Sequence, residues 1–151
     1  ANFTLRLSYG MVDGYSPVEG LRYVHYTLPQ SLIDKNEHNP ANPDYHLLPS
    51  VLDWLRKGRF GKKYADKDSG EMQLCFLTNN DITGGNSGSG MFDSKGRLIG
   101  LAFDGNWEAM SGDLKFDPHL QRCIGVDIRY VLSVMHTYGK AKHLVKELKL
   151  E

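Results

Sequence analysis

Residues 73–104 read QLCFLTNNDITGGNSGSGMFDSKGRLIGLAFD, and this stretch carries the main β-sheet signal of the chain. Two apolar runs flank a loop of small and polar residues. The expected elements are a strand at 73–78, the loop at 79–90, a strand from Met91, a turn at 93–96 and a strand at 97–104. Short β runs separated by dense turn residues are typical of a sandwich or barrel.

The rest of the chain adds strands and helices around this centre. Alternation predicts a half-buried strand at 2–8, with Phe3, Leu5 and Leu7 on one face. Further expected elements are strands at 22–26 and 122–127, and helices at 31–35, from Pro49 to Gly58 or Gly61, from Ile128 to about Tyr138, and around Leu144, Val145 and Leu148 with these three side chains inward. The predicted fold is mainly β with flanking helices, in one domain over 1–151 with a helical tail at about 128–149.

Composition narrows the function classes. The chain has 151 residues, with Lys+Arg 18 and Asp+Glu 18, so its formal net charge is zero. That balance argues against nucleic acid and anionic membrane surfaces as partners. No run approaches the roughly 20 apolar residues of a membrane span. The chain begins Ala1-Asn2 without an initiator Met, and we interpret it as a mature product or an excised piece.

The loop at 79–90 is the candidate site, and several known loop motifs do not fit it. Met91 stands where a phosphate-binding loop needs Lys, and Ser89 stands where a Gly-x-Ser-x-Gly nucleophile elbow needs Gly. Residues 104–115 lack the Gly and Glu of a calcium loop. We expect no metal and no cofactor.

Gly-Asn-Ser-Gly-Ser at 85–89 does fit one site type, because it resembles the nucleophile loop of chymotrypsin-like serine peptidases. An attacking Ser hydroxyl must lie beside backbone N–H groups that stabilise the developing oxyanion. Glycine tolerates the backbone shape that brings those groups together. A plain Gly/Ser-rich hairpin loop remains the alternative on this pentapeptide alone.

Longer segments resemble the C-terminal part of bacterial dipeptidyl-peptidases of the type 7 and type 11 group. The segments that carry this resemblance are 1–10, 60–61, 64–66, 79–89, 96–108, 121–122 and 126–132. The resemblance therefore covers nearly the whole chain. It implies a chymotrypsin-like second β-barrel, with C-terminal helices, that belongs to a larger serine-type catalytic domain.

The resemblance also implies roles for particular residues. Ser87 corresponds to the nucleophile, and the N–H groups of Gly85 and Ser87 correspond to the oxyanion hole. Asp104 corresponds to the carboxylate that holds the α-ammonium group of an oligopeptide substrate with a free N-terminus. The alternative for Asp104 is a turn cap before Gly105. In type 11 members an Arg at the next position selects acidic side chains, so Gly105 predicts apolar residues before the cut, as in type 7.

A Ser nucleophile needs a base and an orienting group, and in this family both lie further N-terminal. The upstream histidines, His25, His38 and His46, lack the expected sequence setting. We therefore expect the isolated chain to be inactive and the rest of a parent chain to supply the triad. A β-rich binding or interaction domain without catalysis is the alternative. Family resemblance further implies a periplasmic or cell-surface location and a homodimer.

Two positions leave questions that the residues do not answer. The family commonly has Pro two places after Gly88, where this chain has Gly90, and this change loosens the exit of the loop. Cys75 and Cys123 lie in or near predicted strands, so either one disulfide or two buried thiols is consistent with the sequence.

Overall fold

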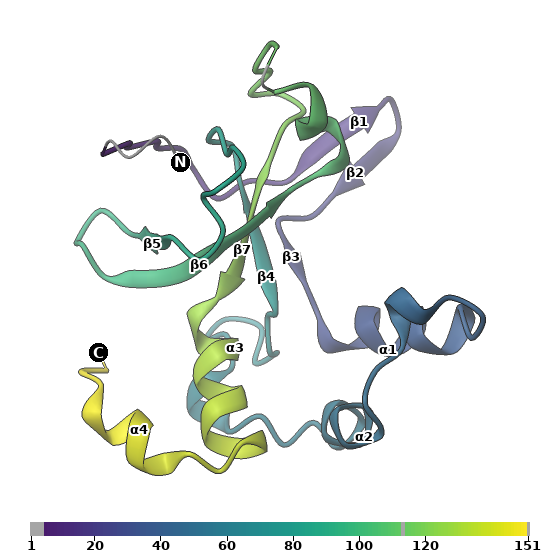
Figure 1. The fold of residues 1–151 in the computed structure, drawn as a ribbon, viewed down its shortest axis with the longest axis vertical. Helices are drawn as coiled ribbons and strands as arrows, with labels where there is room; N and C mark the ends of the chain where they lie inside the picture. Colours follow the sequence, from purple (N-terminus) through teal and green to yellow (C-terminus); the bar gives the residue numbers. More distant parts are fainter. Residues whose placement is uncertain (1–4, 113, 151) are drawn as a thin grey trace. The chain divides into compact units, whose positions relative to one another are not determined.

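The structure, a computed structural model, describes residues 5–112 and 114–150, which form two compact units. The first unit is built from the chain before Leu28 and from Cys75–Ile128, and it contains the strands. The second is built from Leu28–Leu74 and from the chain after Ile128, and it is helical. The fold is thus mainly β with some helices, in line with the predicted fold class (Figure 1).

One five-stranded antiparallel sheet organises the first unit (Figure 1). Its strands follow the order β3 (Tyr26–Thr27), β4 (Cys75–Thr78), β7 (Cys123–Asp127), β6 (Leu98–Gly105) and β5 (Gly90–Phe92). A separate hairpin pairs β1 (Tyr15–Val18) with β2 (Leu21–Tyr23). The strands predicted at 73–78, 97–104 and 122–127 are confirmed, with ends that differ by one or two residues.

A buried aromatic ring explains two glycines in this sheet. Phe76 on β4 is 6% exposed. A Cβ atom added at Gly100 would lie 2.6 Å from its ring, and one at Gly125 would lie 2.9 Å from it. Glycine at these positions therefore leaves the space that the ring occupies.

A β-bulge interrupts β6 near the candidate site. The register between β6 and β7 shifts between Ala102 and Asp104, so that Phe103 is the extra residue. Bulges bend a strand and redirect the groups of the bulged residue. Here the carbonyl oxygen of Phe103 accepts a hydrogen bond from a residue of the 79–90 loop, described below.

The turn between β5 and β6 is stabilised by one carboxylate. Asp93 accepts hydrogen bonds from the N–H groups of Lys95 (2.9 Å) and Arg97 (3.0 Å). Its other oxygen pairs with the Arg97 guanidinium at 2.6 Å. The hydrogen bond from the Arg97 side chain is the main reason that the pKa of Asp93 is lowered to about 2.

We expect Asp93→Asn to lower the free energy of unfolding at neutral pH, and this deficit to shrink in acid. The folded pKa lies below the unfolded value of about 3.9, so the contribution of the carboxylate is complete above about pH 5 and is lost as the pH falls through about 2. Urea unfolding of both proteins between pH 7 and pH 2.5 measures the difference. Asp68→Asn is the control, since the exposed Asp68 carboxylate accepts no hydrogen bond from the residues described. A deficit that stays constant with pH would contradict the prediction.

Helices form the second unit (Figure 1). They are α1 (Pro29–His38), η1 (Pro43–Tyr45), α2 (Pro49–Lys57), η2 (Lys62–Tyr64), α3 (Ile128–Ser133), the π-helical η4 (Val134–Tyr138) and α4 (Lys142–Glu147). Ile33, Trp54 and Leu55 form the buried centre of their core. Helix α2 begins with Pro49 and ends at Gly58, whose left-handed backbone (φ 60°) caps it as the sequence predicts.

Three sequence predictions are wrong in the described residues. The single strand expected at 22–26 is divided, because β2 ends at Tyr23 and β3 begins at Tyr26. Residues 5–8 form no strand, and Leu5 and Leu7 are 100% and 89% exposed; residues 2–4 lie outside the described part. Alternation produces a strand only where one face is buried and the main chain is paired, and here regular pairing begins at Val12, which bridges Thr78. In α4, only Val145 is buried, whereas Leu144 and Leu148 are 44% and 47% exposed.

Candidate functional site

The 79–90 loop is built around the side chain of Asn86. Its Oδ1 atom accepts hydrogen bonds from the N–H (2.9 Å) and the hydroxyl (3.2 Å) of Thr83. The N–H of Asn86 in turn donates to the Thr83 carbonyl at 3.1 Å. An Asn side chain that bonds nearby backbone holds a tight turn in one shape. This pair therefore sets the conformation of the residues directly before Ser87.

The exit of the loop is attached to β6. The N–H of Gly88 donates to the Ala102 carbonyl at 2.7 Å, and the N–H of Ala102 donates to the Ser89 carbonyl at 2.8 Å. Gly85 (φ 92°) and Gly88 (φ 85°) both adopt the left-handed region that other residues rarely enter. Ser87 thus lies between two glycines in a turn anchored on both sides.

The Ser87 side chain is exposed, and its Oγ donates to the carbonyl of Phe103, the bulged residue of β6, at 3.2 Å. This is the hydrogen bond that the structure gives the hydroxyl within residues 5–112 and 114–150. Across the same ranges, no hydrogen bond occupies the N–H groups of Gly85 and Ser87. The hydroxyl and the two main-chain donors therefore come from two residues, Gly85 and Ser87, of one anchored turn.

Four of the described histidines contact residues other than Ser87. The ring of His25 contacts the ring of Tyr26 at 5.1 Å, and His136 bonds the Tyr64 hydroxyl at 2.9 Å. His38 and His46 bond main-chain carbonyls near them in sequence, those of Asp34 and Pro40. No histidine in the described part of the chain is hydrogen-bonded to Ser87.

Asp104 and Gly105 end β6. The Asp104 side chain is exposed, and its Oδ1 accepts a hydrogen bond from the N–H of Gly105 at 2.8 Å. This bond joins two neighbouring residues of the strand and uses one of the two carboxylate oxygens. Gly105 lies close to the next element, η3 (Trp107–Ser111), because an added Cβ would be 2.8 Å from the Cβ of Ala109.

Asn106, the next residue, holds this end of β6 in place, a role that the sequence did not reveal. Its N–H donates to the Arg122 carbonyl at 3.0 Å, and its Oδ1 accepts from the Arg122 N–H at 2.8 Å. Its Nδ2 donates to the Leu120 carbonyl and to Glu108 Oε2, both at 2.8 Å. Burial raises the pKa of the Tyr15 phenol, which stays protonated at neutral pH and donates to the same Glu108 oxygen at 3.0 Å.

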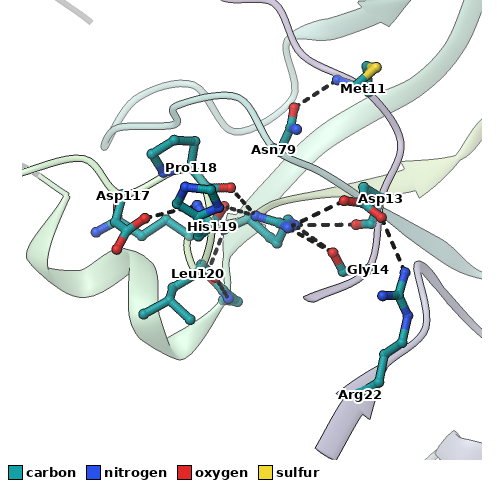
Figure 2. Close-up of polar contacts among 12 residues, drawn as sticks. Met11, Asp13, Gly14, Arg22, Asn79, Asp117, Pro118, His119 and Leu120 are labelled. Atoms are coloured by element: carbon teal, nitrogen blue, oxygen red, sulfur yellow. Dashed lines mark hydrogen bonds and ion pairs between the residues drawn. The ribbon is translucent and has the colours of Figure 1, made fainter. Parts of the chain in front are cut away.

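Arg122 is a second residue whose role sequence reasoning missed. Its side chain is 3% exposed, and its guanidinium donates to the carbonyls of Gly14 (2.7 Å), Pro118 (2.7 Å) and Gln121 (2.8 Å). Asp13 approaches at 3.7 Å as a partial counter-ion. Figure 2 labels Asp13, Gly14 and Pro118, whose oxygen atoms contact this guanidinium. In the sequence, Arg122 was the first residue of the strand predicted at 122–127 and part of the resemblance segment 121–122, and neither observation indicated a buried guanidinium.

The structure answers the question that the sequence left open about the two cysteines. Cys75 and Cys123 are free thiols, and burial raises the pKa of both, so they are protonated at neutral pH.

The residues described contain no group of three or more His, Cys, Asp or Glu side chains placed to hold a metal ion. No helix within them has the length and apolar character needed to cross a membrane. At Gly90, an added Cβ would lie 2.8 Å from the Phe92 ring.

Residues 1–150 match the family model described as Peptidase S46. The chain is 52% identical over 150 residues to dipeptidyl-peptidase 7 of Porphyromonas endodontalis, covering 99% of this chain and 18% of that protein. It is 45% identical over 150 residues to the Asp/Glu-specific dipeptidyl-peptidase of Capnocytophaga gingivalis, covering 99% and 20%. The chain thus spans about a fifth of the length of these relatives.

Solved crystal structures of a related peptidase are similar to this chain in fold over nearly its whole length. The crystal structure of Porphyromonas endodontalis DPP11 in complex with the dipeptide Arg-Asp matches with a TM-score of 0.90 and 34% identity, over 100% of this chain and 21% of that one. The complex of the same protein with Arg-Glu matches with a TM-score of 0.88 and 35% identity, over 97% and 20%.

Proposed function

This chain belongs to the peptidase S46 family, and on that premise we propose that it is the C-terminal catalytic part of a serine-type dipeptidyl-peptidase, with Ser87 as the nucleophile. The observation that supports this most is the anchored turn at 85–88. It presents an exposed hydroxyl next to main-chain N–H groups that no hydrogen bond occupies in the described residues. Such free donors are what a developing oxyanion needs.

The proposed reaction is acyl transfer. Ser87 Oγ attacks the carbonyl carbon of the second residue of the substrate, and its proton goes to a base on another part of the parent chain. The N–H groups of Gly85 and Ser87 stabilise the oxyanion of the tetrahedral intermediate. The amine of the shortened peptide leaves with a proton, and water then releases the dipeptide from Ser87. In this proposal the sheet belongs to a chymotrypsin-like second barrel, completed by the rest of the parent.

Asp104 is the proposed partner of the substrate α-ammonium group. Its side chain is exposed, and its hydrogen bond from the Gly105 N–H uses only Oδ1. A charge-assisted hydrogen bond from the ammonium group to the carboxylate distinguishes a free N-terminus from an internal peptide bond. Family resemblance extends the proposal to a periplasmic or cell-surface location and to a homodimer.

The test uses the full-length protein that contains this chain. We expect it to release dipeptides from a peptide with a free N-terminus and not from the N-acetylated form of the same peptide. Diisopropyl fluorophosphate should modify Ser87, as read by mass spectrometry of the peptide that contains it. Release from both forms of the peptide, or modification elsewhere with Ser87 untouched, would contradict the proposal.

Gly105 leads to a prediction on substrate choice. The position offers no charge, and the added Cβ of any other residue would meet Ala109 at 2.8 Å. We expect kcat/KM to be at least about 10-fold higher for apolar than for acidic side chains before the cut, because burying an unpaired carboxylate is costly. Kinetics with two dipeptidyl substrates that differ only at this residue measure the ratio. A preference for Asp or Glu would overturn this part of the proposal.

A further inference from the structure

We propose that Asn106 is a positioning residue for substrate binding: held by Arg122, it sets the Asp104 carboxylate at the place where the substrate ammonium group binds. This inference rests on the proposed function of Asp104. It assigns a role to Asn106 and Arg122, which do not themselves contact the reacting atoms.

Asn106 extends the β6–β7 pairing beyond its last regular pair, Gly105 with Cys123. The main-chain N–H donates to Arg122 and the side-chain Oδ1 accepts from Arg122, at 3.0 and 2.8 Å. The Nδ2 group is engaged twice more, at 2.8 Å each, by Leu120 and Glu108. Because all its donors and its side-chain acceptor are used, the chain two residues after Asp104 has one defined position.

Arg122 keeps its side of this contact rigid. Its guanidinium is buried and bonds the carbonyls of Pro118 and Gln121, just before it in the chain, and that of the distant Gly14, so the residue directly before β7 is tied to the 13–14 segment. The guanidinium also lies 5.6 Å from the centre of the Tyr15 ring. Tyr15 bonds Glu108, and Glu108 bonds Asn106, which closes a ring of contacts back to Arg122.

Asp104 depends on these contacts because its own side chain has little to hold it. The carboxylate is exposed, and its hydrogen bond within the described residues is to the N–H of the very next residue. That bond moves with the main chain and does not fix it. A displacement of about 1 Å at a binding group can cost about 100-fold in rate. The main chain at Asp104 is held by the pairing of Asp104 with Ile124 and of Gly105 with Cys123, and Asn106 extends this pairing by one residue, so in this proposal it fixes the end of the strand from which the carboxylate projects.

The experiment compares Asn106→Ala, Asp104→Asn and the double variant in the full-length protein. We expect Asn106→Ala to raise KM for a free dipeptidyl substrate by about 10-fold or more. The rate of Ser87 modification by diisopropyl fluorophosphate, which has no amino group, should stay within about twofold. The double variant should match Asp104→Asn alone, since a positioning residue has nothing left to position once the carboxylate is gone.

Three outcomes would overturn the inference. Losses that add fully in the double variant show that Asn106 acts independently of Asp104. An equal loss in the rate of Ser87 modification shows a general structural role. If Asp104→Asn itself leaves KM unchanged, the ammonium site is wrong and the inference falls with it, which separates that failure from the first two.

Tyr15→Phe serves as a milder variant if Asn106→Ala does not fold. It removes only the phenol oxygen that donates to Glu108. We expect a KM rise of about threefold, in line with the net value of one hydrogen bond, again with unchanged modification of Ser87. An unchanged KM would contradict the ring of contacts as the positioning device.

Discussion

Ser87→Ala in the full-length protein is expected to lower kcat for dipeptide release by about 10⁴- to 10⁶-fold. The variant loses the atom that attacks the carbonyl, and the oxyanion donors and substrate contacts alone provide only a small residual acceleration. Steady-state kinetics with a fluorogenic dipeptidyl substrate measure the loss. KM should change little, because the hydroxyl bonds only the Phe103 carbonyl and not a substrate-binding group.

Ser89→Ala is the matched control for this prediction. Ser89 lies in the same turn and is exposed, and its main chain, not its hydroxyl, makes the bonds to Asn86 and Ala102. We expect its kcat to stay within a few-fold of the unchanged protein. Activity of Ser87→Ala above about a hundredth of the original, or an equal loss in both variants, would remove Ser87 from its proposed role.

The isolated 151-residue chain is expected to show no measurable turnover, a loss of about 10⁴-fold or more relative to the full-length protein. The Ser87 hydroxyl is hydrogen-bonded to a carbonyl, and no histidine of the described residues bonds it. Without a base, a Ser hydroxyl is a weak nucleophile at neutral pH. The measurement compares the two proteins at equal concentration, both for dipeptide release and for modification by diisopropyl fluorophosphate. Modification of Ser87 in the isolated chain at the rate of the full-length protein would contradict the prediction.

Much of the sheet could be predicted because its signals are local. The β5–β6 turn contains Asp93, which bonds the N–H groups of Lys95 and Arg97, all within five residues. The helix from Pro49 begins and ends with residues whose backbone preferences suit those positions. The strand predicted at 2–8 failed for the opposite reason. Whether Leu5 and Leu7 are buried depends on surfaces that residues far away in the sequence would have to supply.

The candidate site likewise contains residues that the sequence indicated and residues that only the structure revealed. Gly85 and Ser87 could be named from a short motif, whereas the proposed roles of Asp104 and Gly105 came from the family resemblance. Asn106 could not be assigned, since its partner Arg122 lies 16 residues further on. Arg122 itself donates to the carbonyl of Gly14, 108 residues away in the sequence, and no local sequence pattern predicts such a bond.

Residue order was sufficient for the 79–90 loop, its nucleophile candidate and the strands on either side, because glycine conformations and short-range hydrogen bonds act between near neighbours. Packing in three dimensions was needed for the bulge at Phe103, for the free thiols and for the Arg122–Asn106 contacts. Each of these depends on which segments, distant in the sequence, pack against one another. Whether a guanidinium or a thiol is buried is decided by that packing and not by the residue type.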